Sequence, residues 1–598
     1  MAWGNRFHFH FDSVHGAEYD IYILKDGYTG TCDERALGRA PVLRKKQNGP
    51  ICGTSLELYA ECRVDSNGVS EYAEMYTTNP KEYRVVIYRD ATPAVAVPLW
   101  VGFVSTELYS APSIAPPYDV HIVATDGLGE LKLNNYVAQG EMTLLNLFKH
   151  LLGFTGREQS FYFATNLKQH SGTRTGLLDW RIDVDFLDGK SCYDVLTDLL
   201  NTLHATITPY GTRWLIARET DVRSLLDGNG QLSVVEISSR TPRPTIVNVA
   251  TAEKTIGQMG VADLWPIGYY SHVAVPAKKT VTVSSRWHTQ NILANPNMIQ
   301  SEGEWGLEPY TWYLAHHWDD DLTPGGIMLG DSIHDQLGTA YQSFRFQRLN
   351  MPLRIASSCF GLGLSDESAR LYMFVRYYAD DGTVYHGDVR GWRQDTTVRD
   401  SIEVSKFNGY QQYEVKIRAY DINKPGTLVV YFHGINVCLG SAEFTQEILN
   451  EGYKDTIYID NNSRSDGEEV EMLHGRITSS EFDYSPVLTG VFKTIVAGEK
   501  QLLFSFDNSQ YSDLDLLSLM ALDRATSVAA VRLKVDGLFD FPASMAVVPW
   551  LIRQGSQDFW VDTWELNLLE DELKLEATSL PDATLVVESE SVVPIKDT

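Results

Sequence analysis

The chain has 598 residues, of which 43% are hydrophobic and 21% are charged, so it is globular and long enough for about three to five domains. Its formal net charge is −28, which argues against stable nucleic-acid binding, because a sequence-independent binder needs dense lysine and arginine to displace the counterions of phosphate. None of the six cysteines forms a CxxC pair, which argues against a zinc ribbon or a redox motif. Sparse cysteine suits assembly in a reducing cytoplasm.

Neither a secretory signal nor a transmembrane helix is expected. The first ten residues lack the apolar core of a signal peptide. The most apolar stretch, residues 94–104, is short and is broken by Pro98.

Residues 1–135 are predicted to form a β-barrel or β-sandwich. The run from Phe7 to Phe11 alternates phenylalanine with histidine, which is the period of a half-buried strand. Further short strands are expected at 21–24, 56–63 and 83–88, separated by glycine, asparagine, aspartate and proline signals.

Residues 136–222 are predicted to form a small α+β domain. Thr143 is a suitable N-cap for a helix with leucines and a phenylalanine on one face, and Gly153 ends it. Ser191 caps a second helix, in which Asp194 takes the usual glutamate position of a capping box. A hairpin at 205–218 completes the domain.

The second half of the chain is predicted to be mostly β. Residues 223–290 are expected to form a β connector, and residues 291–440 an inserted jelly roll with a hairpin turn at Asp380–Thr383. Residues 441–598 are expected to contain a helix after Asp513, a second set of strands and a C-terminal tail.

No catalytic signature is present. The sequence lacks GxSxG, HExxH and GxxxxGK[ST], so no catalytic residue, cofactor or metal ligand is assigned. His8 and His10 share a strand face and resemble a metal pair, but a polar strand face is the preferred interpretation. The acidic run after His316 offers calcium ligands, although consecutive carboxylates are more typical of a solvated loop. Glu302, Glu304 and Glu308 are considered as acids for sugar hydrolysis, but their closeness in sequence does not define a separation.

An aromatic cluster within the inserted block is the candidate contact site for a glycan or a partner. Exposed aromatic rings stack on sugars and anchor interfaces. The alternative is that these rings fill the jelly-roll core or a subunit contact. The candidates are Trp305, Tyr310, Trp312 and Trp318.

Several segments together resemble a known family. Leu99–Ser105, Pro116–Val120 and Ala124–Leu128 resemble the N-terminal barrel of phage tail hub (baseplate hub) proteins, especially those of Bacteroidetes-type phages. Ser191–Leu200 followed by Arg213–Arg218 is similar to that family's small α+β domain. Residues 529–537 and 564–567 resemble its second barrel, and 291–440 resembles the carbohydrate-binding-like jelly rolls of tail proteins.

The resemblance implies a mainly β virion protein rather than an enzyme. Two tail-tube-like barrels per subunit, within 1–135 and 441–598, would form a pseudo-sixfold ring in a homotrimer at the distal end of the tail, assembled in the host bacterial cytoplasm. The implied partners are the distal tail protein or tail tube hexamer, the tape measure protein, tip spike or fibre proteins, and DNA as a transient passenger during ejection. The alternative function is a tail-tip protein that binds or degrades a glycan of the host surface during attachment.

Overall fold

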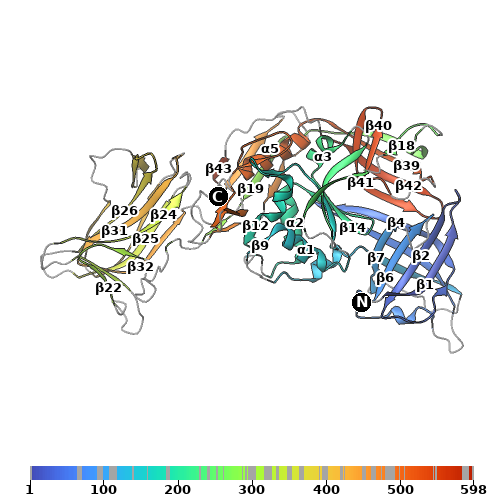
Figure 1. Ribbon diagram of the computed structural model, residues 1–598, viewed down its shortest axis with the longest axis horizontal. Helices are drawn as coiled ribbons and strands as arrows, with labels where there is room; N and C mark the ends of the chain where they lie inside the picture. The colour runs from blue at the N-terminus through green and yellow to red at the C-terminus, as the bar shows by residue number, and fades with distance from the viewer. Residues whose placement is uncertain are drawn as a thin grey trace.

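The computed structural model shows a mainly β chain, as the sequence predicts. A sandwich lies at one end of the long axis, two barrels lie at the other, and a helical region lies between them (Figure 1). None of the described helices is long and apolar enough to cross a membrane. The structure describes residues 3–63, 70–90, 98–106, 117–137, 141–157, 159–183, 187, 189–227, 230–238, 243–250, 254–259, 262–285, 287–289, 293, 305–314, 326–330, 336–346, 353–362, 369–388, 391–393, 402–407, 409–417, 422, 424–446, 453–459, 466–472, 475–477, 492–496, 499–503, 505–542, 545, 548–581 and 592–594.

The first barrel contains the strands of the N-terminal region. Its order is β4–β5–β8–β7–β6–β2–β1, and it closes because β3, which leads directly into β4, pairs with β1. Phe7 and Phe9 of β1 are fully buried, as their alternation predicts. Gly49, at φ +60°, makes the tight β4–β5 turn. The strands are β1 (Trp3–Asp12), β2 (Glu18–Asp26), β3 (Asp33–Glu34), β4 (Leu37–Asn48), β5 (Ile51–Cys62), β6 (Tyr83–Arg89), β7 (Trp100–Val104) and β8 (Tyr118–Thr125).

The second barrel combines strands from two distant parts of the chain. Its order is β18–β39–β42–β41–β40–β17. Residues 223–290, predicted to form a β connector, supply β17 and β18 of this barrel. The strands are β17 (Lys254–Thr255), β18 (Pro266–Val275), β39 (Arg532–Asp540), β40 (Leu551–Gln554), β41 (Gln557–Asn567) and β42 (Glu572–Ser579).

Five strands of each barrel share one topology. In the first, β5 pairs with β8, β8 with β7, and β7 with β6. In the second, β39 pairs with β42, β42 with β41, and β41 with β40. The β4–β5 hairpin has its counterpart in the antiparallel pair β18–β39. Residues 276–531 therefore lie at the tip of the second barrel's hairpin, where the first barrel has a tight turn.

The α+β domain carries a mixed sheet in the order β13–β14–β10–β15–β16. Thr143 and Ser191 cap their helices as predicted, and each accepts a hydrogen bond from the backbone N–H three residues on. The sequence predicts that this domain ends near residue 222. In the structure β15 and β16 extend its sheet beyond that point, because β15 pairs with β10. The elements are α1 (Leu144–Gly153), β10 (Phe161–Ala164), α2 (Cys192–Leu203), β13 (Thr206–Tyr210), β14 (Arg213–Ala217), α3 (Glu219–Leu225), β15 (Gln231–Ile237) and β16 (Thr245–Ala250).

Helix α5 (Leu516–Val528) and several small sheets connect this domain to the sandwich (Figure 1). The helix starts at Leu516, capped by Asp515, rather than directly after Asp513, because Leu514 bridges to Phe506. The small sheets are formed by β19 (Thr280–Ser285), β33 (Tyr453–Tyr458), β34 (Glu468–Glu471) and β43 (Val592–Pro594); by β9 (Glu141–Thr143), β12 (Arg181–Asp183), β36 (Lys493–Val496) and β37 (Glu499–Leu502); by β20 (Trp287–Thr289) and β35 (Gly475–Ile477); and by β11 (Lys168–Gln169) and β38 (Phe506–Asp507).

The inserted block is a sandwich of two sheets that bury their facing sides. One sheet contains β21 (Gly306–Leu307), β24 (Gly338–Phe346), β31 (Gly426–Ile435), β26 (Ala369–Ala379), β27 (Val384–Asp388), β28 (Gly391–Arg393) and β29 (Ile402–Phe407). The other has the order β22 (Thr311–Tyr313), β23 (Ile327–Leu329), β32 (Val437–Gln446), β25 (Leu353–Gly361) and β30 (Gly409–Ile417). Burial alternates strictly along β25, which is the pattern of a strand with one face in a core.

Candidate functional site

The two barrels of the chain are joined edge to edge. Strand β4 leaves the first barrel and pairs antiparallel with β41 of the second, with Val42 opposite Asn567 and Lys45 opposite Trp564. Arg44 forms an ion pair with Glu565 at 2.7 Å. This junction shows that these barrels associate by continuing a sheet, which satisfies the hydrogen bonds of both edges.

A buried ion pair fastens the barrels at a second place. Arg89, at the end of β6, lies 3.2 Å from Asp571, and it donates to the carbonyl of Phe541 at 3.0 Å. The hydroxyl of Tyr19, on β2 of the first barrel, donates a hydrogen bond across the junction to Asp571 at 2.8 Å. Because both charged groups are almost fully buried, removing either one would leave the other unpaired in an apolar interior.

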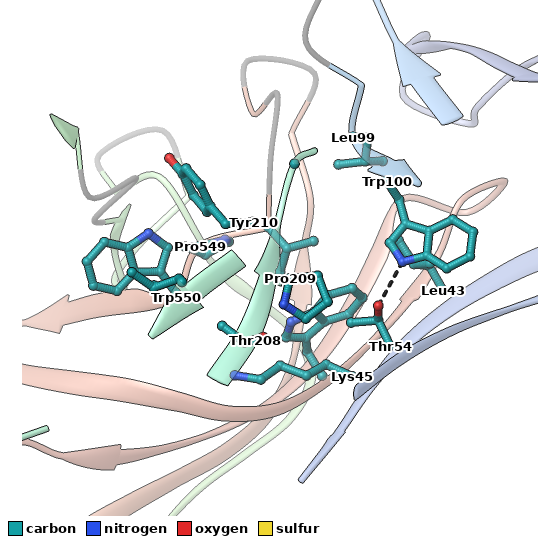
Figure 2. A pocket seen from close by; sticks show the side chains of 14 residues that line it. Leu43, Lys45, Thr54, Leu99, Trp100, Thr208, Pro209, Tyr210, Pro549 and Trp550 are labelled. Atoms are coloured by element: carbon teal, nitrogen blue, oxygen red, sulfur yellow. Dashed lines mark hydrogen bonds between the residues drawn. The ribbon is translucent and has the colours of Figure 1, made fainter. Parts of the chain in front are cut away.

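A small cavity lies where both barrels meet the α+β domain (Figure 2). Its volume is about 50 Å³, far below the several hundred Å³ of a typical ligand pocket. Trp100 donates from Nε1 to Thr54 at 2.8 Å, and buried Lys45 donates to the carbonyl of Val561 at 2.7 Å. We therefore regard it as a packed junction. The lining residues are Leu43, Lys45, Thr54, Leu99, Trp100, Thr208, Pro209, Tyr210, Gly211, Leu215, Val548, Pro549, Trp550 and Trp564.

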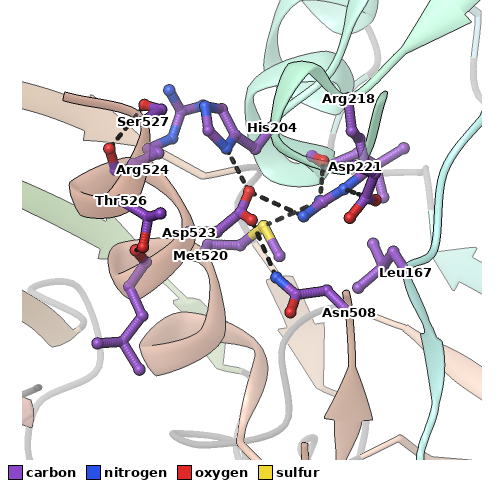
Figure 3. A network of polar contacts seen from close by, with 12 residues as sticks. Leu167, His204, Arg218, Asp221, Asn508, Met520, Asp523, Arg524, Thr526 and Ser527 are labelled. Carbon is purple, nitrogen blue, oxygen red and sulfur yellow. Dashed lines mark hydrogen bonds and ion pairs between the residues drawn. The ribbon is translucent and has the colours of Figure 1, made fainter. Parts of the chain in front are cut away.

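A buried polar network fixes helix α5 to the α+β domain (Figure 3). Arg218 donates to Asp221 and to Asp523, each at 2.8 Å, while Asn508 donates to the second oxygen of Asp523 at 2.9 Å. His204 also contacts Asp523. Both oxygens of Asp523 are therefore occupied, which fits a structural brace better than an acid or base for an outside substrate.

The protonation states within this network follow from burial and charge. Burial acts to raise the pKa of the Asp523 carboxyl, but the Arg218 charge, the contact with His204 and the hydroxyl of Thr220 together outweigh it and hold that pKa well below its usual range. Burial lowers the pKa of His204, and nearby Arg524 lowers it further. At neutral pH the network therefore contains an ionised Asp523 beside a neutral His204.

The outer strand of the second barrel has an open edge. Strand β18 pairs with β39 on one side, and among the described residues its other edge pairs with no strand. Its apolar side chains are exposed: Ile267 by 45%, Tyr269 by 48% and Val273 by 51%. An exposed apolar strand edge is a template for pairing with another chain.

The outer face of the sandwich's five-stranded sheet carries a row of apolar and aromatic side chains. Register places Trp312 opposite Met328, Met328 opposite Cys438, Cys438 opposite Phe360, and Phe360 opposite Tyr410. The row therefore crosses all five strands. Its two ends are open, with Trp312 exposed by 46% and Tyr410 by 47%, while Met328 and Cys438 are buried.

The structure separates the four aromatic candidates of the sequence. Trp305 is 7% exposed and packs edge-to-face on Phe432, so the core-filling alternative describes it and it is not an available contact. Tyr310 and Trp312 are exposed, whereas Trp318 lies outside the described residues. Tyr410 joins Trp312 in the row across the sheet.

The histidines and acidic residues considered as metal ligands or catalytic acids are not gathered in one site among the described residues. His8 contacts Asp20 and Glu34, each at 2.7 Å, and His10 contacts Asp20 at 3.0 Å, which raises the pKa of His10. Within the described ranges, no group of three or more histidine, cysteine, aspartate or glutamate side chains is arranged to hold a metal ion. The acidic run at 316–321 and residues 302 and 304 lie outside those ranges.

Comparisons with known proteins give no family. No family model matches the chain, and a search of curated proteins finds no match. Solved structures with some likeness include the enzymatically active domain of Bacteriophage CBA120 tailspike protein 4, at 11% identity over 26% of this chain and 21% of that chain, with a TM-score of 0.20. The chain thus spans about a fifth of that tailspike domain.

Two carbohydrate-binding modules also show a partial likeness. The xylan-binding CBM22-1 domain of Paenibacillus barcinonensis Xyn10C is 10% identical over 27% of this chain and 97% of its own, with a TM-score of 0.19. TmCBM61, solved with β-1,4-galactotriose, is 12% identical over 26% of this chain and 99% of its own, with a TM-score of 0.17. Scores this low assign neither a family nor a function.

Three features of the candidate sites could not be predicted from the sequence. Tyr410, the partner of Trp312 across the sheet, is far from the aromatic cluster in sequence, and only the strand order brings them into one row. The open edge of β18 depends on a pairing with β39 across residues 276–531. The network around Arg218 joins residues about 300 positions apart, and no local pattern signals it.

Proposed function

We propose that the chain is a structural subunit of a phage-type tail tip, in which copies join side by side through their barrels into a ring around a channel. One observation carries the proposal. The chain contains two barrels that share a five-strand topology, joined by β4 and β41, while β18, the counterpart of β4, has one edge with no partner strand among the described residues.

The strand topology shared by the two barrels supports one arrangement for a second copy. Within one chain, β4 of the first barrel extends β41 of the second. The counterpart of β41 in the first barrel is β7. Strand β18 of one copy would therefore extend the sheet at the end of β7 in the next copy, past Phe103, where the pairing of β7 with β6 stops, so that the contact between chains repeats the contact within a chain. Repetition of one such head-to-tail contact generates a closed ring when the rotation between copies closes on itself.

The proposed ring is a homotrimer, as the resemblance to tail hub proteins implies. Three chains would supply six barrels, which suits an adaptor between a sixfold tail tube or distal tail ring and a threefold tip. Tape measure protein and then DNA would pass through its centre. The proposal assigns the chain no catalytic step, metal or cofactor.

The test changes the open edge alone. Val273→Lys combined with Ile267→Lys places two charges on the exposed side chains of β18, and burying them between copies costs several kcal/mol. We expect light scattering after size exclusion to report a trimer for the parent chain. The double variant should be monomeric, or should dissociate at more than about tenfold higher concentration.

A matched control separates the edge from general charge effects. Leu133→Lys combined with Val137→Lys adds the same two charges at side chains that are 76% and 65% exposed elsewhere, and it should leave the trimer intact. A parent chain that stays monomeric at high micromolar concentration, with six-barrel rings also absent from electron micrographs, would refute the proposal.

A further inference from the structure

We infer that the outer face of the sandwich's five-stranded sheet binds a neutral oligosaccharide, an activity beyond the ring-forming role proposed above. The face is defined by two neighbouring rows of side chains. The first is the aromatic and apolar row from Trp312 through Met328, Cys438 and Phe360 to Tyr410.

The second row is polar and uncharged. Ser441 lies opposite Ser358, and Ser358 lies opposite Gln412. The hydroxyls of Ser358 and Ser441 are hydrogen-bonded at 2.7 Å, and Gln412 donates to the Tyr410 hydroxyl at 2.5 Å. The amide and hydroxyl groups are thus held in fixed positions beside an exposed ring, where each has further hydrogen-bonding capacity.

A hollow opens over the polar row, beside the aromatic one. Its volume is about 420 Å³, within the range of known ligand sites. It is lined by Arg354, Ala356, Ser357, Ser358, Gln412, Tyr413 and Ser441. Arg354 is the single charged residue in this lining, so the described part of the surface is nearly neutral.

This combination of side chains matches the chemistry of a sugar chain. A pyranose has apolar C–H faces that stack on aromatic rings and a rim of hydroxyls that bond to amides and hydroxyls. Five strands about 4.8 Å apart separate the two exposed rings by roughly 19 Å, which spans several sugar units. A polyanion would require more cations than the lining offers, and a peptide adding to a sheet needs an open strand edge rather than a face.

Affinity electrophoresis of the full chain tests the inference. The probes are native gels containing arabinoxylan, mixed-linkage β-glucan, galactomannan or dextran, with polygalacturonate as an acidic polysaccharide. We expect at least one neutral polysaccharide to retard the parent chain. Trp312→Ala and Tyr410→Ala should each weaken that retention about tenfold or more, whereas Tyr410→Phe, which keeps the ring, should retain most of it.

The control variant is Tyr458→Ala, which removes a tyrosine that is 57% exposed on β33, outside the sandwich; its retention should equal that of the parent. Light scattering on the same samples separates loss of sugar binding from loss of assembly. Retention by polygalacturonate alone, equal loss in the control, or no retention in any of these gels and on an array of neutral glycans would overturn the inference.

Discussion

At the scale of single residues, burial decides which charged groups matter for stability. Arg218 is fully buried between Asp221 and Asp523, whereas the pair of Arg63 and Glu61 lies at the surface, with the arginine 72% exposed. Removing one partner of a buried ion pair leaves an uncompensated charge in a low-dielectric interior. Surface pairs are screened by water and contribute little.

Arg218→Met should therefore destabilise the contact between α5 and the α+β domain strongly. We expect a loss of about 3–5 kcal/mol, because two carboxylates lose their shared cation. Differential scanning calorimetry and urea titration measure the loss. Arg63→Met is the matched control and should change the free energy of unfolding by no more than about 0.5 kcal/mol. Equal effects of the two substitutions would contradict a bracing role for the network.

At the scale of elements, the sandwich is attached at one narrow place. Strands β19 and β33 run antiparallel, and Ser285 lies opposite Tyr453, so the chain leaves and returns at adjacent residues. A short linker can therefore replace the segment between them without stretching the backbone, since facing residues of a strand pair are about 5 Å apart.

Replacing residues 291–452 with a short glycine-serine linker should leave the barrels, the α+β domain and α5 folded. We expect the shortened chain to keep the oligomeric state of the parent, since β18 and β7 are untouched, and to lose retention by polysaccharide. Light scattering and affinity electrophoresis measure the two properties separately. A shortened chain that still binds sugar would place the site elsewhere, and loss of assembly would show that the sandwich contributes to the ring.

At the scale of the whole molecule, charge determines how the chain interacts with a passing polyanion. A net charge of −28 makes contact with DNA unfavourable, because few phosphate counterions would be displaced. We expect fluorescence anisotropy with a labelled DNA duplex to show no binding even at about 50 mM salt. Binding that weakens steeply towards about 200 mM salt would reveal a cationic surface and contradict this expectation.

Local sequence patterns predicted the helix caps and turns better than they predicted which strands pair with one another. The capping residues Thr143 and Ser191 and the hairpin turn at Asp380–Thr383 lie where the sequence indicates, because these structures depend on neighbours within a few residues. The β connector predicted at 223–290 could not be assigned to the second barrel from the sequence, since β18 finds its partner only beyond residue 531. Sequence spacing carries no information about such a pairing.

The candidate sites also contain some residues that local patterns identify and others that only the strand pairing reveals. Trp312 was recognised because a cluster of aromatic residues is visible in the sequence, but Trp305 of the same cluster is buried against Phe432. Which face of a strand each ring takes depends on the register of the sheet. Tyr410 could not be linked to Trp312, because three strands of the sheet separate them.

Because residues 276–531 lie at a hairpin tip, the segment inserted there can be exchanged without changing the second barrel. The backbone re-enters the second barrel opposite the residue from which it left, with Val275 facing Arg532, so the length and content of the intervening chain do not alter the barrel's register. A module of different ligand preference, grafted between Ser285 and Tyr453, would be carried in as many copies as the assembly has chains. Weak individual contacts would then add up to firm attachment through avidity.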